Sequence, residues 1–205
     1  MVASIKTVAF QGIEVLDIDV QVQIAGGLPA FQIVGLPDKT VAESKERVRS
    51  ALHAIGLALP PKRLTVNLAP ADVAKEGSHY DLPIALGLLA AMEVIDPREI
   101  SDYVAIGELG LDGALRRVYG VLPASIHANA RECGMLCPAA CGGEAAWAGD
   151  LDILAPDSLL QLINHLKGSQ VLTRPEAGID QDNQPAPPDM ANVRGQDSAR
   201  RALEI

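Results

Sequence analysis

The feature that most constrains the fold is the run 84–92, Ile-Ala-Leu-Gly-Leu-Leu-Ala-Ala-Met, which is apolar nearly all round a helix. A surface helix has a single apolar stripe, so a helix without a polar face must be enclosed by other elements. The run is too short to cross a bilayer, which needs about 20 residues. Asp81 is expected to cap this helix, and Pro83 falls in its first turn, where proline is tolerated. The chain must therefore build a layered core around it.

Short alternating runs predict strands that could enclose this helix. The clearest is 13–24, where Ile18, Val20 and Val22 are interleaved with acidic and amide side chains. The other expected strands are 4–10, 30–34, 64–68, 103–108, 114–118, 135–137 and 151–154. The other expected helices are 39–55, 121–132, 139–148 and 158–167. This mixture predicts one α/β domain of two layers over residues 1–168.

The composition changes after Gly168. Residues 169–190 hold four prolines among Gln, Asp and Asn, with almost no apolar pattern, which predicts a flexible linker. Residues 191–205 then begin a new helical pattern, from about Gln196, that stops unfinished. We therefore expect a further module beyond Ile205.

The charge of the chain is unevenly distributed. The net charge is −9, which argues against general nucleic-acid binding, yet residues 39–75 hold seven basic and three acidic side chains. Such asymmetry can steer an anionic partner to one face. A mixed-charge helix surface that is simply solvated remains the alternative for the helix part of this segment. The few aromatic residues make a base-stacking platform unexpected.

Cysteines and terminal residues bear on the compartment. Three cysteines, spaced C-x3-C-x3-C at 133, 137 and 141, match no standard zinc or cluster pattern and suit a reducing cytosol as packing thiols. No apolar signal core or membrane-spanning run is present in the sequence. We therefore expect a soluble, cytoplasmic protein without a metal site and without a membrane partner.

Four blocks of sequence carry a family resemblance. They are Gly35-Leu-Pro-Asp38 with the helix residues 43–49, then 75–86, then Gly107-Glu108, and finally 193–205. In this order they resemble the Mg-chelatase-like AAA+ ATPases of the ComM and YifB type. The resemblance implies that residues 1–168 form a Lon-protease-like domain of the ribosomal protein S5 domain 2 type. It also implies that 191–205 begin the ATPase module, just before its Walker A loop.

The resemblance also implies a function for the whole protein. Members of this type are identified as hexameric ATPases that act on branched DNA in recombination and natural transformation, with ATP and Mg²⁺ as cofactors. The ATP site would lie beyond Ile205, so no cofactor is expected within this chain, and the N-terminal domain would be non-catalytic. If that domain contacts DNA, the candidates are Lys45, Arg49, Lys62, Arg63 and Lys75, through phosphates.

Two other functions stay open. A Lon-type peptidase needs a serine with a lysine base in hydrogen-bond reach. The positions at or beside the Lon site are Ser78, His79, Asp81 and Ala124. Alanine stands near the lysine position, and no lysine occurs in residues 76–166, so a degenerate site is expected. Glu108 could orient backbone amides nearby. The other alternative, a magnesium-chelatase ATPase subunit, would need a partner subunit and a porphyrin.

Overall fold

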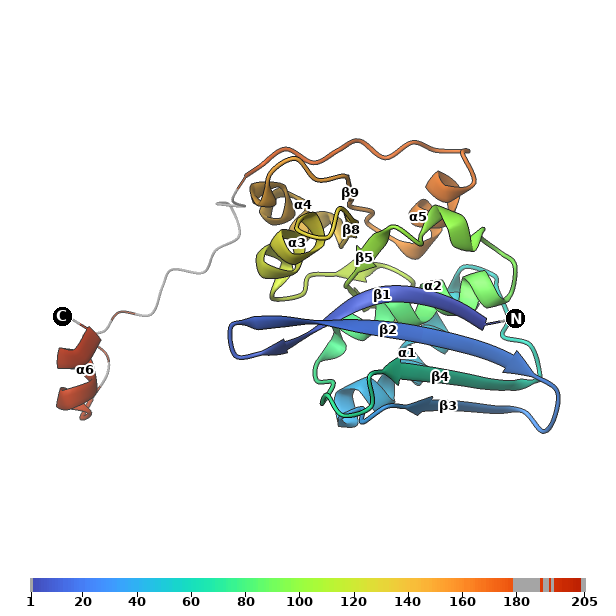
Figure 1. The fold of residues 1–205 in the computed structure, drawn as a ribbon, viewed down its shortest axis with the longest axis horizontal. Coiled ribbons are helices and arrows are strands. Elements are labelled where there is room, and N and C mark those ends of the chain that lie inside the picture. Colours follow the sequence, from blue (N-terminus) through green and yellow to red (C-terminus); the bar gives the residue numbers. More distant parts are fainter. Residues whose placement is uncertain (1, 179–188, 190–191, 193, 204–205) are drawn as a thin grey trace.

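The computed structural model describes residues 2–178, 189, 192 and 194–203. A mixed sheet with the strand order β3-β4-β2-β1-β5-β8-β9 forms its centre (Figure 1). The strands are β1 (Val2–Gln11), β2 (Glu14–Ala25), β3 (Ala30–Val34), β4 (Arg63–Ala69), β5 (Tyr103–Ala105), β8 (Gly134–Leu136) and β9 (Ile153–Leu154). The helices are α1 (Lys39–Ala54), α2 (Asp81–Ala91), α3 (Val121–Asn129), α4 (Ala139–Ala145), α5 (Leu159–Leu166) and α6 (Asp197–Leu203). The structure confirms the predicted α/β fold.

The sheet has an antiparallel half and a parallel half. β2 pairs antiparallel with both β1 and β4, and Val22 lies opposite Ala3 on one side and Val66 on the other. β5, β8 and β9 pair parallel, in continuation of β1. A separate hairpin, β6 (Glu108–Leu109) with β7 (Leu115–Arg116), turns at Asp112-Gly113.

One face of the sheet carries the main core. Side chains of β1, β2 and β4 that point to this face pack with α1, α2 and α5. α2 is the predicted buried helix, and Leu82 to Ala90 are all buried along it. Leu86 and Leu88 are fully enclosed. Because each Å² of apolar surface removed from water stabilises the fold by about 25 cal/mol, such side chains make the principal stabilising contacts.

The opposite face is covered over the parallel half alone. There α3 and α4 pack on Val8, Val104, Met135 and Ile153, together with all three cysteines. Over β2 and β3, outward residues such as Gln23 and Gln32 are exposed. Antiparallel strands such as β2 tolerate a wet face, whereas parallel strands need cover on both faces, so β3, which pairs parallel with β4, departs from the expected rule.

Five expectations about element boundaries need correction. The strands expected at 114–118 and 151–154 are shorter, Leu115–Arg116 and Ile153–Leu154. The strand expected at 103–108 ends at Ala105, because the Gly107 N–H donates to the His79 carbonyl at 2.9 Å instead of continuing the ladder. The helix expected at 121–132 ends at Asn129. Asp81 is not a cap: it lies inside the first turn of α2, and its carboxylate bonds to other elements.

Side-chain caps and a glycine mark the ends of α1 and α5. Asp38 caps α1 through a bond from the Val41 N–H at 2.7 Å, and Gly56 follows the helix with a positive φ of 82°. Ser158 caps α5. Among the described residues, no helix is both long and apolar enough to span a bilayer. Much of the predicted linker, 179–188 and 190, lies outside the described residues, and the proposed domain boundaries stay a prediction.

Candidate functional site

The candidate site is the turn that leads into α2. Gly77 has φ +97°, and the 3₁₀ turn η1 (Ser78–Tyr80) follows it and runs directly into the helix. The turn is held from one side by Gly107, which bonds through its N–H to His79 and through its carbonyl to the Leu82 N–H, both at 2.9 Å. Gly107 follows β5 and the turn itself follows β4, and Leu36 and Asp38, which follow β3, bond to Lys75 just before the turn. Segments from three strands therefore meet at this turn.

The second side of the turn is held by Lys75. Its carbonyl accepts from the Asp38 N–H at 2.9 Å, and its own N–H donates to the Leu36 carbonyl at 3.2 Å. Its side chain is buried, and its ammonium donates to the Pro70 carbonyl. Burial lowers the pKa of Lys75, although Asp72 acts in the other direction. Lys75 therefore faces neither Ser78 nor solvent.

Ser78 has a carboxylate as its partner. Its half-buried hydroxyl donates to Glu108 Oε2, and Glu108 begins β6. A Ser-Lys nucleophile needs an amine in this place. Among the described residues, neither an amine nor an imidazole bonds to the Ser78 hydroxyl. Glu108 thus binds the serine rather than the backbone amides that it was expected to orient.

His79 is held by a bond from its ring to the backbone of β1. Its Nε2 lies 3.0 Å from the Val8 carbonyl, which can only accept, so Nε2 carries the proton. Burial lowers the pKa of His79, which outweighs the opposite influence of the Val8 bond. The ring also lies edge-on to Phe10, with 5.5 Å between ring centroids. His79 therefore fastens the turn to β1 rather than facing an open cleft.

Asp81 forms the strongest polar contact in the site. Arg47 of α1 binds it in bidentate fashion, with Nε 2.6 Å from Oδ2 and Nη2 3.0 Å from Oδ1, and the Leu109 N–H donates to Oδ2 at 3.1 Å. Asp81 is fully buried, and the Arg47 side chain is 21% exposed. The pair joins α1, α2 and β6 at one point.

Burial and bonding act in opposite directions on this pair. Burial raises the pKa of the Asp81 carboxyl, and the bonds from Arg47, Ser44 and the Leu109 N–H oppose that rise. The hydrogen bond to Asp81 raises the pKa of Arg47 in turn. The sequence pattern suggested that charged side chains of α1 form a solvated surface, but Arg47 binds the buried Asp81 instead. No spacing rule pairs residues so far apart in sequence, so only the packing of α1 on α2 shows this contact.

Ala124 lies among apolar side chains. It is fully buried in α3, in the cluster that contains Val8 and Ile106, and its N–H donates to the Gly120 carbonyl at 3.1 Å. An alanine methyl can neither donate nor accept a proton. The structure thus brings Ser78, His79 and Asp81 together in one turn, and places Ala124 within an apolar layer.

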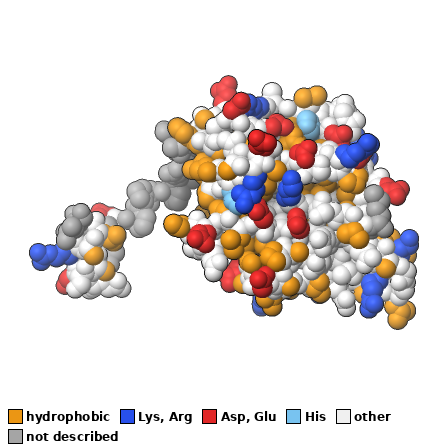
Figure 2. Space-filling model, viewed as in Figure 1, with side chains coloured by type: hydrophobic (Ala, Val, Ile, Leu, Met, Phe, Trp, Pro, Cys, Tyr) orange, Lys and Arg blue, Asp and Glu red, His pale blue; other side chains and the backbone are white. Residues whose placement is uncertain are grey.

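The basic candidates do not form one cluster. Lys45 and Arg49 lie on α1, and Lys62 and Arg63 lie at the start of β4, where Arg63 stands between Ala25 and Ala30 in the sheet. Arg49 is 3.5 Å from Glu46, whereas Lys45, Lys62 and Arg63 have no ion pair with any described residue. On the face in Figure 2, basic and acidic side chains are interspersed.

Lys62 also lines a surface hollow at the end of α2. The hollow measures about 360 Å³, and Ile24, Pro60 and Met92 are among its other lining residues. In the part of the chain that the structure describes, no three His, Cys, Asp or Glu side chains gather as a metal site would require. The three cysteines are free and buried, and burial raises the pKa of Cys137 and Cys141.

Comparison with known proteins identifies the family. The family described as subunit ChlI of Mg-chelatase matches residues 20–140, which include the turn before α2 and the Arg47–Asp81 pair. The chain belongs to this Mg-chelatase-like family, and to its ComM/YifB type. It is 36% identical to the competence protein ComM of Haemophilus influenzae over 202 residues, which covers 96% of this chain and 40% of that protein.

Two further relatives are similar over the same extent. Proteins called YifB from Salmonella typhimurium and Escherichia coli are each 38% identical, over 99% and 98% of this chain. In each case the chain spans 40% of the relative's length. The predicted membership of the ComM/YifB type is thus confirmed, whereas the activity of the longer proteins is a matter for proposal.

Proposed function

We propose that this chain is the non-catalytic N-terminal domain of a hexameric, ATP-driven machine that remodels branched DNA in recombination and natural transformation. The observation that carries the non-catalytic part is the Ser78–Glu108 pair, in a turn where the Ser-Lys dyad of a peptidase would need an amine. The DNA part is supported by membership of the ComM/YifB type and by one relative's name, competence protein. ATP and Mg²⁺ would bind in the following module, in the cytoplasm.

The domain would contribute shape and an electrostatic guide to such a machine. Lys45, Arg49, Lys62 and Arg63 lie at or near the surface and could contact phosphates, which carry no sequence information. Lys75 is buried and would support the turn instead. Every phosphate contact releases counterions, so log K falls as log salt rises. Each lost contact makes this negative slope less steep by about 0.9.

The test is a charge reversal in the longer protein that carries the ATPase module. Lys62→Glu with Arg63→Glu should weaken DNA binding and reduce the salt slope by about 2. The matched control is Arg98→Glu with Arg116→Glu, which changes the net charge equally at two exposed positions outside 39–75. Equal binding by both variants across the salt series would remove DNA contact from the proposal.

The two alternatives have their own tests. A peptidase would be labelled at Ser78 by a fluorophosphonate probe, and labelling would reverse the non-catalytic assignment. The chelatase alternative is favoured by the name of the matching family. It predicts that the longer protein binds a partner subunit and supports magnesium insertion into a porphyrin, which is measured by the change in porphyrin absorbance.

A further inference from the structure

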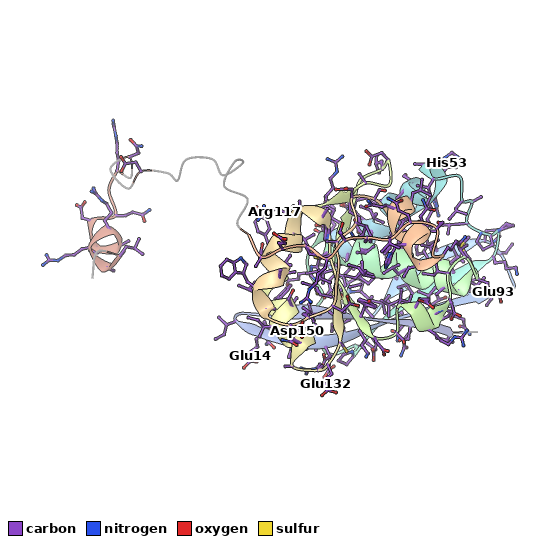
Figure 3. All side chains as sticks on the ribbon, turned by 90° about the horizontal axis from the view of Figure 1, so that it is seen from above. Glu14, His53, Glu93, Arg117, Glu132 and Asp150 are labelled. Atoms are coloured by element: carbon purple, nitrogen blue, oxygen red, sulfur yellow. The ribbon has the colours of Figure 1, made fainter. Side chains whose placement is uncertain are left out.

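The segment after α5 does not leave the domain directly. It runs across the domain from α5 to α4 (Figure 1), and residues 169–178 contact both helices. Arg117 and Asp150 lie toward one end of the domain, whereas His53 and Glu93 lie toward the opposite end (Figure 3). The path of this segment therefore decides where the following chain begins.

The first anchor of the segment is at α5. The Asn164 carbonyl accepts from the Ser169 N–H at 2.9 Å and from the Gln170 N–H at 3.2 Å. The Leu172 N–H then donates to His165 Nδ1 at 3.1 Å, and the Leu172 side chain packs on the main core. These contacts reverse the chain direction after α5 and start it toward α4.

The second anchor is a pair of adjacent glycines in α4. The Gly178 N–H donates to the Gly143 carbonyl at 3.3 Å, and a Cβ on Gly143 would lie 2.8 Å from the Gly178 oxygen. A Cβ on Gly142 would lie 2.9 Å from Pro175 Cβ. Glycine is among the poorest helix formers. Two of them inside so short a helix are explained by the close approach of this segment.

An ion pair lies between the two anchors. Arg174 donates to Asp150 Oδ1 through both terminal nitrogens, each at 3.1 Å. Both side chains are largely exposed, so this pair adds little by itself. The glycine seat and the α5 turn are the principal attachments.

We infer that residues 169–178 are a latch, seated on Gly142 and Gly143, that fixes the exit of the chain beside α4. When the latch is seated, the last residue that it holds against the domain is Gly178. When it is released, the last held residue lies near Gly168, and the greatest distance that the chain can span from its point of attachment grows by on the order of 30 Å. The latch thus controls how firmly the following segment is positioned relative to the sheet. This inference does not depend on the proposed DNA function.

Amide hydrogen exchange on the 205-residue chain tests the latch. In the unaltered chain, the Gly178 and Leu172 amides should be protected. Gly143→Ala should raise the exchange rate of the Gly178 amide at least about tenfold while the amides of α2 stay protected. Gly26→Ala is the matched control, because a Cβ there has no atom within 4 Å and should change nothing.

A second variant leaves α4 intact. Arg174→Ala removes only the exposed ion pair and should raise the exchange of the Gly178 amide by no more than about fivefold. Spin labels at Gln23→Cys and Ser198→Cys should show a broader, longer distance distribution when Gly143→Ala is added. An unprotected Gly178 amide in the unaltered chain would overturn the inference. So would unchanged exchange and unchanged distances in Gly143→Ala.

Discussion

The Arg47–Asp81 pair gives the sharpest test of how the candidate turn is held. Arg47→Met keeps most of the side chain's length but removes both hydrogen bonds to a fully buried carboxylate. Breaking a buried pair from one side costs about 3–5 kcal/mol. Asp81 keeps its bond from the Leu109 N–H, so we expect a loss of about 3 kcal/mol in the free energy of unfolding.

The double variant separates pairing from packing. Asp81→Leu alone leaves Arg47 without its partner and Leu109 with an unpaired N–H, which costs about 1–3 kcal/mol for the amide alone. With Arg47→Met added, the two apolar side chains can pack together, and the double variant should lose about 1–2 kcal/mol, less than either single change. The interaction energy of the pair would then exceed about 3 kcal/mol, because the loss in the double variant is smaller than the loss in Asp81→Leu.

The pH dependence of Arg47→Met has a definite sign. Burial already raises the pKa of Asp81 above its value of 3.8 in a free side chain, and loss of Arg47 removes an influence that lowers it. A carboxyl whose pKa is higher in the folded state stabilises the fold below its unfolded pKa, and this stability is lost as the pH rises through the folded pKa. The deficit of Arg47→Met relative to the unaltered chain should therefore be smaller at pH 4.5 than at pH 7.

Urea unfolding followed by far-ultraviolet circular dichroism measures these differences. The single tryptophan, Trp147, is 59% exposed and is a poor reporter of the core. A loss below about 1 kcal/mol for Arg47→Met at pH 7, or a double variant equal to the sum of the two single losses, would refute the reasoning, since exposed or uncoupled ion pairs behave in that way.

Three further predictions concern other parts of the domain. Leu86→Ala, in the enclosed helix α2, should cost about 2–5 kcal/mol in urea unfolding, because its surroundings cannot collapse on the cavity. Ser78→Ala should remove one hydrogen bond and lower the free energy of unfolding by about 1 kcal/mol. A fluorophosphonate probe should label this variant and the unaltered chain to the same extent, because Ser78 is not a nucleophile. Partial burial acts to raise the pKa of Asp17, but bonds from His127 and Arg131 outweigh it and lower the pKa. Asp17 should therefore stabilise the fold above pH 3.8, and this stability should be lost as the pH falls. The free energy of unfolding of Asp17→Asn, measured between pH 2 and 6, should therefore fall less in acid than that of the unaltered chain.

The layers of the fold follow from local sequence pattern. The run 84–92 predicted an enclosed helix, and the alternation along 13–24 predicted a strand. Both hold, because burial on one face or on every face leaves a direct trace in the order of apolar residues. The strand expected at 103–108 was too long because a tertiary bond from Gly107 diverts the backbone, and no local pattern reports such a bond.

The polar contacts of the candidate site were less predictable. Sequence reasoning found Ser78, His79 and Asp81 as neighbours, since they lie within one turn. It could not give their partners, because Glu108 and Arg47 come from distant segments. It also treated Lys75 as a surface cation, although the main-chain bonds to Leu36 and Asp38 draw this residue inside. Net charge along a segment says nothing of which side chains are enclosed.

The position of α5 sets a minimum length for an independently stable unit. Leu159, Leu162 and Ile163 complete the same apolar layer as α2, yet, apart from the partly buried Leu166 and Leu172, they are the last part of that layer to be synthesised. β1 must likewise wait for β5 to arrive before it gains a neighbour on its second side. While fewer than about 166 residues have emerged from the ribosomal exit tunnel, α5 is incomplete and the central helix α2 stays partly in water. Chaperones can bind the apolar surface that is then exposed.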